Sequence, residues 1–198
     1  MRRMLVMAVV LIAAMTVSGE PAMAQSSSDR SIELNALFGR GGISVGDIGF
    51  KAGNAFGASF EYPMFQGEKF ALNASMGFTH ASTKPIATDL GNVTASQNSV
   101  GGGMIVYAWP KKKFRPYGGF DQGIVSNKFS VGGTGQSRNA YGTGLFGGFK
   151  FDIGERISLG PRAGYVFSSS YGYDQNGNVQ RQGIRGTQLL VVVSWRFK

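Results

Sequence analysis

Few residues of this chain have the types and the spacing that catalysis requires. His80 is its single histidine, and Ser82 follows two residues later. A serine acts as a nucleophile when a base lies within hydrogen-bond reach and a third group orients that base. Asp89, in the segment that follows, is an acidic residue that could approach His80. The alternative interpretation is a histidine at a membrane interface that begins a polar loop.

Three glycine-containing segments match ligand-binding loops only in part. Gly142–Gly147 fits G-x-G-x-x-G, but a dinucleotide site needs a helix after the glycines, and here a strand pattern continues. Gly132–Ser137 lacks the Gly-Lys-Ser/Thr ending of a phosphate loop, so we expect a mobile loop there. Asp174–Asn178 lacks the bidentate glutamate of a calcium loop, and the chain has no cysteine for a thiolate metal site. We therefore expect no cofactor, no metal and no catalytic site.

The elements that must position these residues are strands. Apolar and polar residues alternate with period 2, which predicts half-buried β-strands. Eight such segments are found, at residues 31–38, 56–62, 69–78, 99–109, 115–125, 141–151, 157–168 and 188–197. Segments 99–109 and 115–125 are apolar on both faces, so their phases stay open.

The connectors between these segments alternate in length. The short ones are residues 63–68, 110–114 and 152–156, and the long polar ones are about 40–53, 81–95, 127–139 and 169–183. Short turns at one end and long loops at the other are typical of transmembrane barrels with an even number of strands. The fold class is therefore all-β: an eight-stranded antiparallel up-and-down transmembrane β-barrel over residues 31–198. A secreted soluble sandwich or lipocalin-like barrel is the alternative.

Aromatic residues gather near both predicted ends of the strands, as the two interfaces of a membrane require. Near the short turns are Tyr62, Phe65, Phe70, Trp109, Phe114, Tyr117, Phe149, Phe151, Trp195 and Phe197. Near the long loops are Phe38, Phe56, Phe78, Tyr141, Phe167 and Tyr171. A soluble barrel would place its large apolar residues inside and lack these girdles.

Several charges lie on the polar face of the strands. Parity places Glu33, Glu61, Lys69, Lys150, Arg162 and Arg196 inside the barrel. Asp121 lies in a segment of open phase, but a charge facing lipid is costly, so we place it inside although this turns Gln122 toward lipid. Buried charges require partners. We expect Glu33, Glu61, Asp121, Lys150 and Arg162 to form a network of ion pairs, which either fills the lumen or gates small ions.

The start of the chain has the features of a secretory signal peptide. Arg2 and Arg3 precede the apolar run 4–17, and Ala22-Met23-Ala24 is a small-x-small cleavage site. We expect residues 1–24 to be removed after Ala24, and residues 25–30 to form a short polar lead-in. The remaining chain has 18 basic and 10 acidic residues, a net charge of +8. After export, an anionic membrane surface is the expected partner rather than nucleic acid.

Two local motifs carry a family resemblance. Arg115–Gly119 begins one predicted strand, and Val191–Phe197 ends the chain with alternating hydrophobic residues that close on an aromatic. With the eight-strand meander, these residues resemble the small outer-membrane barrel family typified by the OmpA and OmpX barrels. The resemblance implies an outer-membrane location. It also implies that Val191, Val193, Trp195 and Phe197 form the signal for the barrel-assembly machinery, although Lys198 follows where the family often ends.

The first functional hypothesis is a non-enzymatic outer-membrane barrel that serves envelope integrity or surface recognition through extracellular loops. The lead-in, the short turns and the C-terminus would then face the periplasm. A narrow ion or small-solute channel is the second hypothesis. The third is a lipid A-modifying enzyme, because His80-Ala81-Ser82 is similar to the His-x-Ser of outer-membrane lipid A deacylases. The expected partners are outer-membrane lipids including lipopolysaccharide and, during biogenesis, the assembly machinery, and we expect a monomer.

Overall fold

The computed structural model describes residues 31–46, 48–89, 91–173 and 179–197. The predicted signal peptide and lead-in, and the segment 174–178, lie outside the described residues. Among the described residues, no helix is long and apolar enough to span a membrane.

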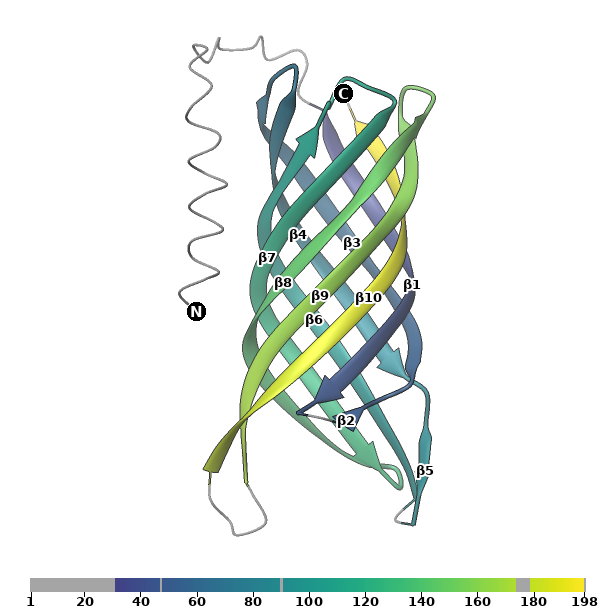
Figure 1. The fold of residues 1–198 in the computed structure, drawn as a ribbon, viewed down its shortest axis with the longest axis vertical. Coiled ribbons are helices and arrows are strands. Elements are labelled where there is room, and N and C mark those ends of the chain that lie inside the picture. The colour runs from purple at the N-terminus through teal and green to yellow at the C-terminus, as the bar shows by residue number, and fades with distance from the viewer. Residues whose placement is uncertain (1–30, 47, 90, 174–178, 198) are drawn as a thin grey trace.

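Eight long strands form one closed sheet within the described residues (Figure 1). They are β1 (Ile32–Val45), β3 (Ala52–Gln66), β4 (Phe70–Thr83), β6 (Gly91–Ala108), β7 (Phe114–Val131), β8 (Thr134–Ile153), β9 (Ile157–Tyr173) and β10 (Val179–Phe197). Two short strands, β2 (Ile48–Gly49) and β5 (Ile86–Thr88), add to β1 and β6 at the far end from the termini of the sheet. Each long strand pairs antiparallel with the next, which confirms the predicted up-and-down barrel.

The barrel closes where the first strand meets the last. β1 pairs with β10 without interruption from Ile32 opposite Phe197 to Val45 opposite Ile184. A sheet in hydrocarbon has no water to satisfy the N–H and C=O groups of an open edge, so closure removes that cost.

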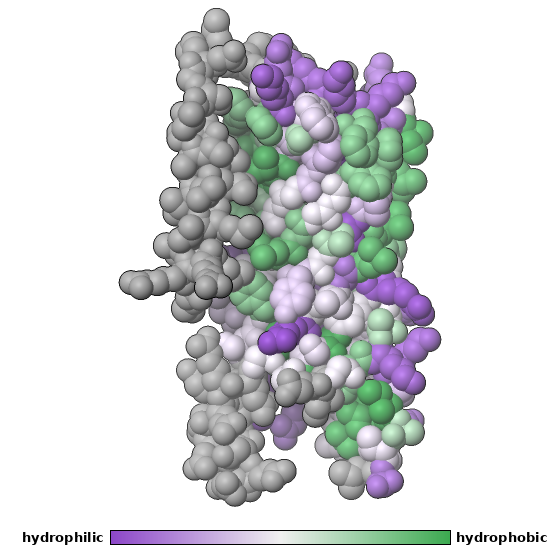
Figure 2. All heavy atoms as spheres, in the orientation of Figure 1, coloured by the Kyte–Doolittle hydropathy of each residue, from purple (hydrophilic) through white to green (hydrophobic). Residues whose placement is uncertain are grey.

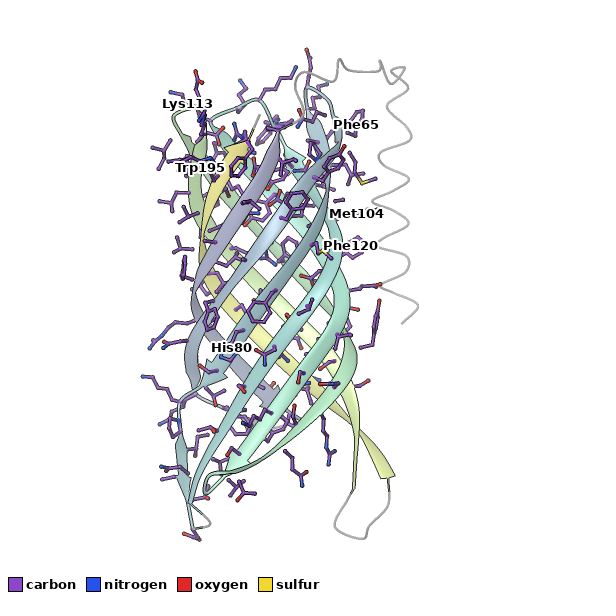
Figure 3. The ribbon with its side chains drawn as sticks, turned by 180° about the vertical axis from the view of Figure 1, so that it is seen from behind. Phe65, His80, Met104, Lys113, Phe120 and Trp195 are labelled. Carbon is purple, nitrogen blue, oxygen red and sulfur yellow. The ribbon has the colours of Figure 1, made fainter. Side chains whose placement is uncertain are left out.

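Side chains alternate between the interior and the outer surface, as the period-2 pattern predicts. On β10, Leu189 is 65% exposed, whereas the adjacent Leu190 is 2% exposed. Figure 3 shows Phe65, Met104, Phe120 and Trp195 on the outside of the ribbon. The large apolar residues therefore face outward, the reverse of a soluble barrel.

The phases of the two ambiguous segments are fixed by their buried residues. Tyr107 on β6 and Tyr117 on β7 point inward and are nearly fully buried, and their rings lie 5.4 Å apart. Assigning Tyr117 to the girdle near the short turns was therefore wrong, because it shares the parity of the inward Asp121. Gln122 does face outward, and Tyr141 Oη donates a hydrogen bond of 2.9 Å to Gln122 Oε1.

The strands run further toward the long-loop end than the sequence pattern predicts. Most of the predicted loops 81–95 and 127–139 belong to β4, β6, β7 and β8. Gly132 and Gly133 form the turn between β7 and β8 with φ of 58° and 90°, a conformation that suits tight hairpins. The prediction of a mobile loop over 132–137 was wrong. Beyond the apolar belt the outer face meets water and apolar residues such as Ile43 and Phe129 face the lumen, so the backbone ladder continues but the apolar-outward alternation stops.

The extra length divides the barrel into two zones. A tilted spanning strand needs ~9–11 residues, whereas β6 has 18 and β8 has 20. At about 3.3 Å per residue and a tilt of about 40°, roughly eight surplus residues extend a sheet by about 20 Å. His80 lies at the start of this polar extension, partway along the barrel (Figure 3), and Figure 2 shows hydrophilic side chains at the short-turn end and again beyond the apolar zone. We name this part the outer extension; it comprises the residues beyond Phe38 and Phe78 and before Phe56 and Tyr141, their counterparts on neighbouring strands, and the connecting segments at this end.

The tight curvature of the sheet yields the first prediction. A Cβ at the buried Gly160 would lie 1.7 Å from the carbonyl oxygen of Phe149, so Gly160→Ala must shift the backbone. We expect it to lower the free energy of unfolding by about 1–3 kcal/mol, measured by urea unfolding in lipid vesicles through tryptophan fluorescence. Gly118→Ala is the control, since its Cβ would meet no atom closer than 3.8 Å. Equal effects of the two substitutions would contradict this packing.

Candidate functional site

The barrel interior near the short turns is built around one buried carboxylate. Glu33 on β1 forms ion pairs with Lys150 Nζ at 2.7 Å, with Arg115 at 2.9 Å and with Arg196 Nε at 3.2 Å. Its side chain is 5% exposed. Three cations from three other strands therefore converge on a group that burial alone would make very costly to ionise.

Lys150 connects this carboxylate to a second one. Its ammonium also contacts Asn35 Oδ1 at 2.9 Å and Glu61 Oε1 at 3.0 Å, which uses all three of its donors. Tyr107 Oη donates a 2.7 Å hydrogen bond to Glu61 Oε2. Lys150 is 1% exposed, so its charge is stabilised by these contacts rather than by water.

Asp152 completes the network in the layer nearest the short turns. Arg115 donates to Asp152 Oδ1 at 2.9 Å and Arg196 donates to the same oxygen at 3.0 Å. Parity predicted that Arg196 points inward, but Arg115 and Asp152 were not predicted as members. Asp152 stands two residues after Lys150 on the same strand, and that spacing could have revealed it.

The predicted network divides into two parts. Asp121 and Arg162 lie inside the barrel, but they pair with each other, at 3.7 Å, and no ion pair joins them to Glu33 or Glu61 in the described part of the chain. The Arg162 guanidinium lies 3.7 Å from the centre of the Phe146 ring. Lys69, also predicted to point inward, is exposed in the turn before β4, because β4 begins one residue later.

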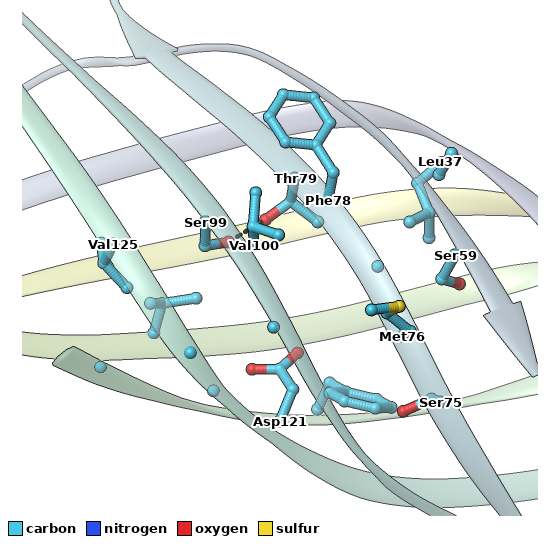
Figure 4. Close-up of a pocket in the computed structure, with 18 of the residues that line it drawn as sticks. Leu37, Ser59, Ser75, Met76, Phe78, Thr79, Ser99, Val100, Asp121 and Val125 are labelled. Atoms are coloured by element: carbon cyan, nitrogen blue, oxygen red, sulfur yellow. Dashed lines mark hydrogen bonds between the residues drawn. The ribbon is translucent and has the colours of Figure 1, made fainter.

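A small cavity separates the two parts from the outer half of the lumen. Its volume is about 30 Å³, room for about two waters. Figure 4 shows Asp121, Ser75 and Ser59 among the residues that line it. Five inward glycines leave this space: Gly77, Gly101, Gly123, Gly142 and Gly144. Arg162 lines the cavity, and its Nε atom is buried without a protein hydrogen-bond partner, which suits a hydrated cavity rather than a dry one.

An apolar cluster fills the lumen of the outer extension. Ile43, Ala95 and Ile184 are buried there, and Phe50 and Phe129 pack against them. The Phe50 N–H bonds to the Ile43 carbonyl at 2.9 Å, which extends the β1–β2 pairing by one residue pair. The described lumen is therefore filled with ion pairs at one end and with apolar side chains at the other.

The charges inside the described lumen balance. The acids are Glu33, Glu61, Asp121 and Asp152, and the bases are Arg115, Lys150, Arg162 and Arg196. The positive charge of the chain must then lie outside the lumen.

His80 and Ser82 do not form a catalytic arrangement with an acid. His80 Nδ1 pairs with Asn98 Oδ1 at 2.7 Å, and its ring stacks on Phe56 with centres 4.8 Å apart. Ser82 Oγ donates to the Asn54 carbonyl at 3.1 Å. Within the described chain, no carboxylate bonds to His80, and no group of three or more His, Cys, Asp or Glu could hold a metal. The glycine motif 142–147 lies inside β8, where no helix follows it.

The predicted assembly signal lies on the outer face of β10. Val191, Val193, Trp195 and Phe197 are all exposed, and the Trp195 and Phe197 rings lie 6.3 Å apart. Their role in assembly stays a prediction.

The ion network generates the second prediction. Lys150→Met would leave Glu33 and Glu61 without their shared cation, so we expect a loss of about 3–5 kcal/mol in the free energy of unfolding, measured by urea titration in vesicles. Lys128→Met, at an exposed site on β7, should change the same quantity by less than about 0.5 kcal/mol. An unchanged midpoint for Lys150→Met would show that the network does not stabilise the barrel.

Comparison with known proteins supports the fold. Neisserial surface protein A superposes with a TM-score of 0.63 at 16% identity, covering 87% of this chain and 100% of that one. Ail, the attachment invasion locus protein of Yersinia pestis, solved with the heparin analogue sucrose octasulfate, gives 0.53 at 12% identity, covering 85% and 99%. OprG from Pseudomonas aeruginosa gives 0.50 at 13% identity, covering 85% and 96%. No curated protein matches the chain in sequence.

A family model gives the assignment. The model described as "Outer membrane protein beta-barrel domain" matches residues 8–197. That match covers nearly the whole chain, and family membership implies an outer-membrane location. The protein therefore belongs to the family of outer-membrane β-barrel domains.

Proposed function

We propose that this protein is a non-enzymatic outer-membrane barrel that recognises anionic saccharides at the cell surface through its outer extension. The observation that carries the proposal is the combination of a filled lumen with a basic outer extension. In this arrangement the short turns and the C-terminal end of β10 face the periplasm. Recognition then depends on paired strands rather than on the extracellular loops that the sequence pattern predicts.

Exposed charges at the outer extension are mostly positive. The exposed bases there are Arg40, Lys51, Lys84, Lys128 and Arg185, and the exposed acid is Asp89, among side chains that the structure describes. The lumen charges are neutral as a set, so they do not offset this surface. Phosphate or sulfate groups on saccharides have the complementary charge and accept hydrogen bonds from arginine and lysine.

The paired strands hold these bases in fixed positions. Arg40 and Arg185 lie on adjacent strands, opposite Leu189 and Ser44. The Lys84 N–H bonds to the Lys51 carbonyl at 2.9 Å, which fixes the start of β3 beside the end of β4. Basic side chains on a rigid backbone lose less conformational entropy on binding than those on mobile loops would.

Lipopolysaccharide and host glycans both present anionic groups that complement these bases. Ail was solved with a sulfated heparin analogue, which is a property of that protein and a guide to a probe for this one. We propose lipopolysaccharide of the surrounding outer leaflet as the constant partner, a monomeric barrel, and assembly through the exposed residues of β10.

Removing two arginines of the outer extension tests the proposal. Each exposed base near an anionic surface contributes about 1 kcal/mol, so Arg40→Gln/Arg185→Gln should weaken binding roughly 30-fold for lipopolysaccharide or heparin, whichever is the ligand. The measurement is titration calorimetry on the folded protein in detergent, repeated at rising salt. Arg156→Gln, exposed at the opposite end, should leave the affinity unchanged.

The outcomes separate the three functions. Equal affinities for the double variant and the wild type would contradict recognition by the outer extension. Steady single-channel conductance of the wild type in planar bilayers would favour the channel instead. A change of lipid A mass that depends on His80 would favour the enzyme.

A further inference from the structure

The turn between β6 and β7 begins with an unusual backbone conformation. Trp109 has φ of 49°, and it is the non-glycine residue with positive φ in the described chain. A bulky residue in the left-handed region is disfavoured, so the surrounding contacts must hold it there. Conformations of this kind tend to persist where a function requires the geometry.

Backbone hydrogen bonds tie this turn to both neighbouring turns. The Trp109 N–H bonds to the Lys69 carbonyl at 2.7 Å, and the Asp152 N–H bonds to the Lys113 carbonyl at 2.8 Å. Within the turn, the Lys112 N–H bonds to the Trp109 carbonyl at 2.9 Å. These bonds bring Lys69 of one turn beside Lys111, Lys112 and Lys113 of the next. We name these four residues the lysine rim; all four side chains are exposed.

Aromatic residues fix the depth of the lysine rim in the membrane. Trp109 is 52% and Phe114 is 38% exposed, and Phe114 packs against Phe149 and Phe151 with ring centres 5.3 Å and 5.0 Å apart. Exposed aromatic rings of a barrel lie at the headgroup level. Lys113, adjacent to Phe114, projects at the same end of the barrel as Trp195 (Figure 3). The ammonium groups therefore meet lipid headgroups rather than hydrocarbon.

The charge of the lysine rim is only partly offset by nearby acids. Outside the lumen, the described turns at this end carry more bases than acids. The bases are Lys69, Lys111, Lys112, Lys113 and Arg156, and the acids are Glu68 and Glu155. Asp152 is occupied by Arg115 and Arg196 inside it. Figure 2 shows hydrophilic residues gathered along this end.

We propose that the lysine rim is a binding site for the phosphate groups of anionic phospholipids in the periplasmic leaflet. The inference rests on the proposed orientation, with the short turns in the periplasm. Its ligand differs from that of the outer extension, since the two basic surfaces face opposite leaflets. The strained corner at Trp109 is then explained, because it holds three consecutive lysines at headgroup depth between two aromatic anchors.

Native mass spectrometry of the folded, detergent-solubilised full protein tests the site. The probe is an equal mixture of phosphatidylglycerol and phosphatidylethanolamine, and the readout is the ratio of bound lipids. Lys111→Gln/Lys112→Gln/Lys113→Gln should lower the preference for phosphatidylglycerol about tenfold or more. The matched Lys→Arg triple variant should retain the preference, because its positive charge is unchanged.

Two further controls keep the result interpretable. Arg40→Gln/Arg185→Gln should leave the lipid preference unchanged, so a failure of surface recognition does not affect this test. Lys112→Gln alone, checked for folding by heat-modifiable gel mobility, should give a smaller loss of preference in the same direction. Reaction of Lys112→Cys with an impermeant reagent on intact cells would refute the proposed orientation, and with it the assignment of the site to the periplasmic leaflet.

The proposal is overturned if the glutamine triple variant keeps the wild-type ratio of bound lipids. It is also overturned if that variant loses co-sedimentation with purified peptidoglycan while its lipid ratio is unchanged, since the lysines would then serve a different partner.

Discussion

In hydrocarbon, a backbone N–H or C=O without a partner costs several kcal/mol, and a sheet meets this constraint by having no edge. The pairing of β1 with β10 satisfies it along 14 consecutive residue pairs. Closure then requires alternate residues to point into a lumen that eight strands make only wide enough for side chains. Both the buried ion pairs and the exposed apolar belt follow from this one constraint.

A narrow lumen determines which residues occupy it. Glu33 and Lys150 are accommodated there because three cations surround the carboxylate and two carboxylates surround the ammonium, all within 3.2 Å. Glycines line the level of Asp121; a Cβ at Gly144 would lie 2.1 Å from Asp121 Oδ1. Since the interior charges balance, the exposed positive charges of the described chain lie at the two ends of the barrel, in the outer extension and the lysine rim.

The sequence correctly predicted which side chains point into the barrel where hydropathy alternates. Parity alone placed Glu33, Lys150 and Arg162 on the inner face, since the opposite face of each strand is apolar. It was insufficient in three places. The predicted loops beyond Phe78 and Ile124 continue as strands. The apolar-outward pattern ends there because the outer face meets water while apolar side chains turn to the lumen. Tyr117 was misplaced because its segment is apolar on both faces. Asp121 and Glu33 lie at different positions along the barrel axis. Strand tilt sets those positions, and parity does not predict them.

Register-specific cross-linking of the closing strands tests the central claim most directly. The chain has no cysteine, and Ala36 lies opposite Val193 across the β1–β10 seam. In the membrane-embedded protein, Ala36→Cys/Val193→Cys should form an intramolecular disulfide in high yield. Ala36→Cys/Val191→Cys, displaced by two residues and about 7–8 Å apart, should form it poorly. Efficient cross-linking of the displaced pair, or none of the matched pair, would contradict the closed barrel at this register.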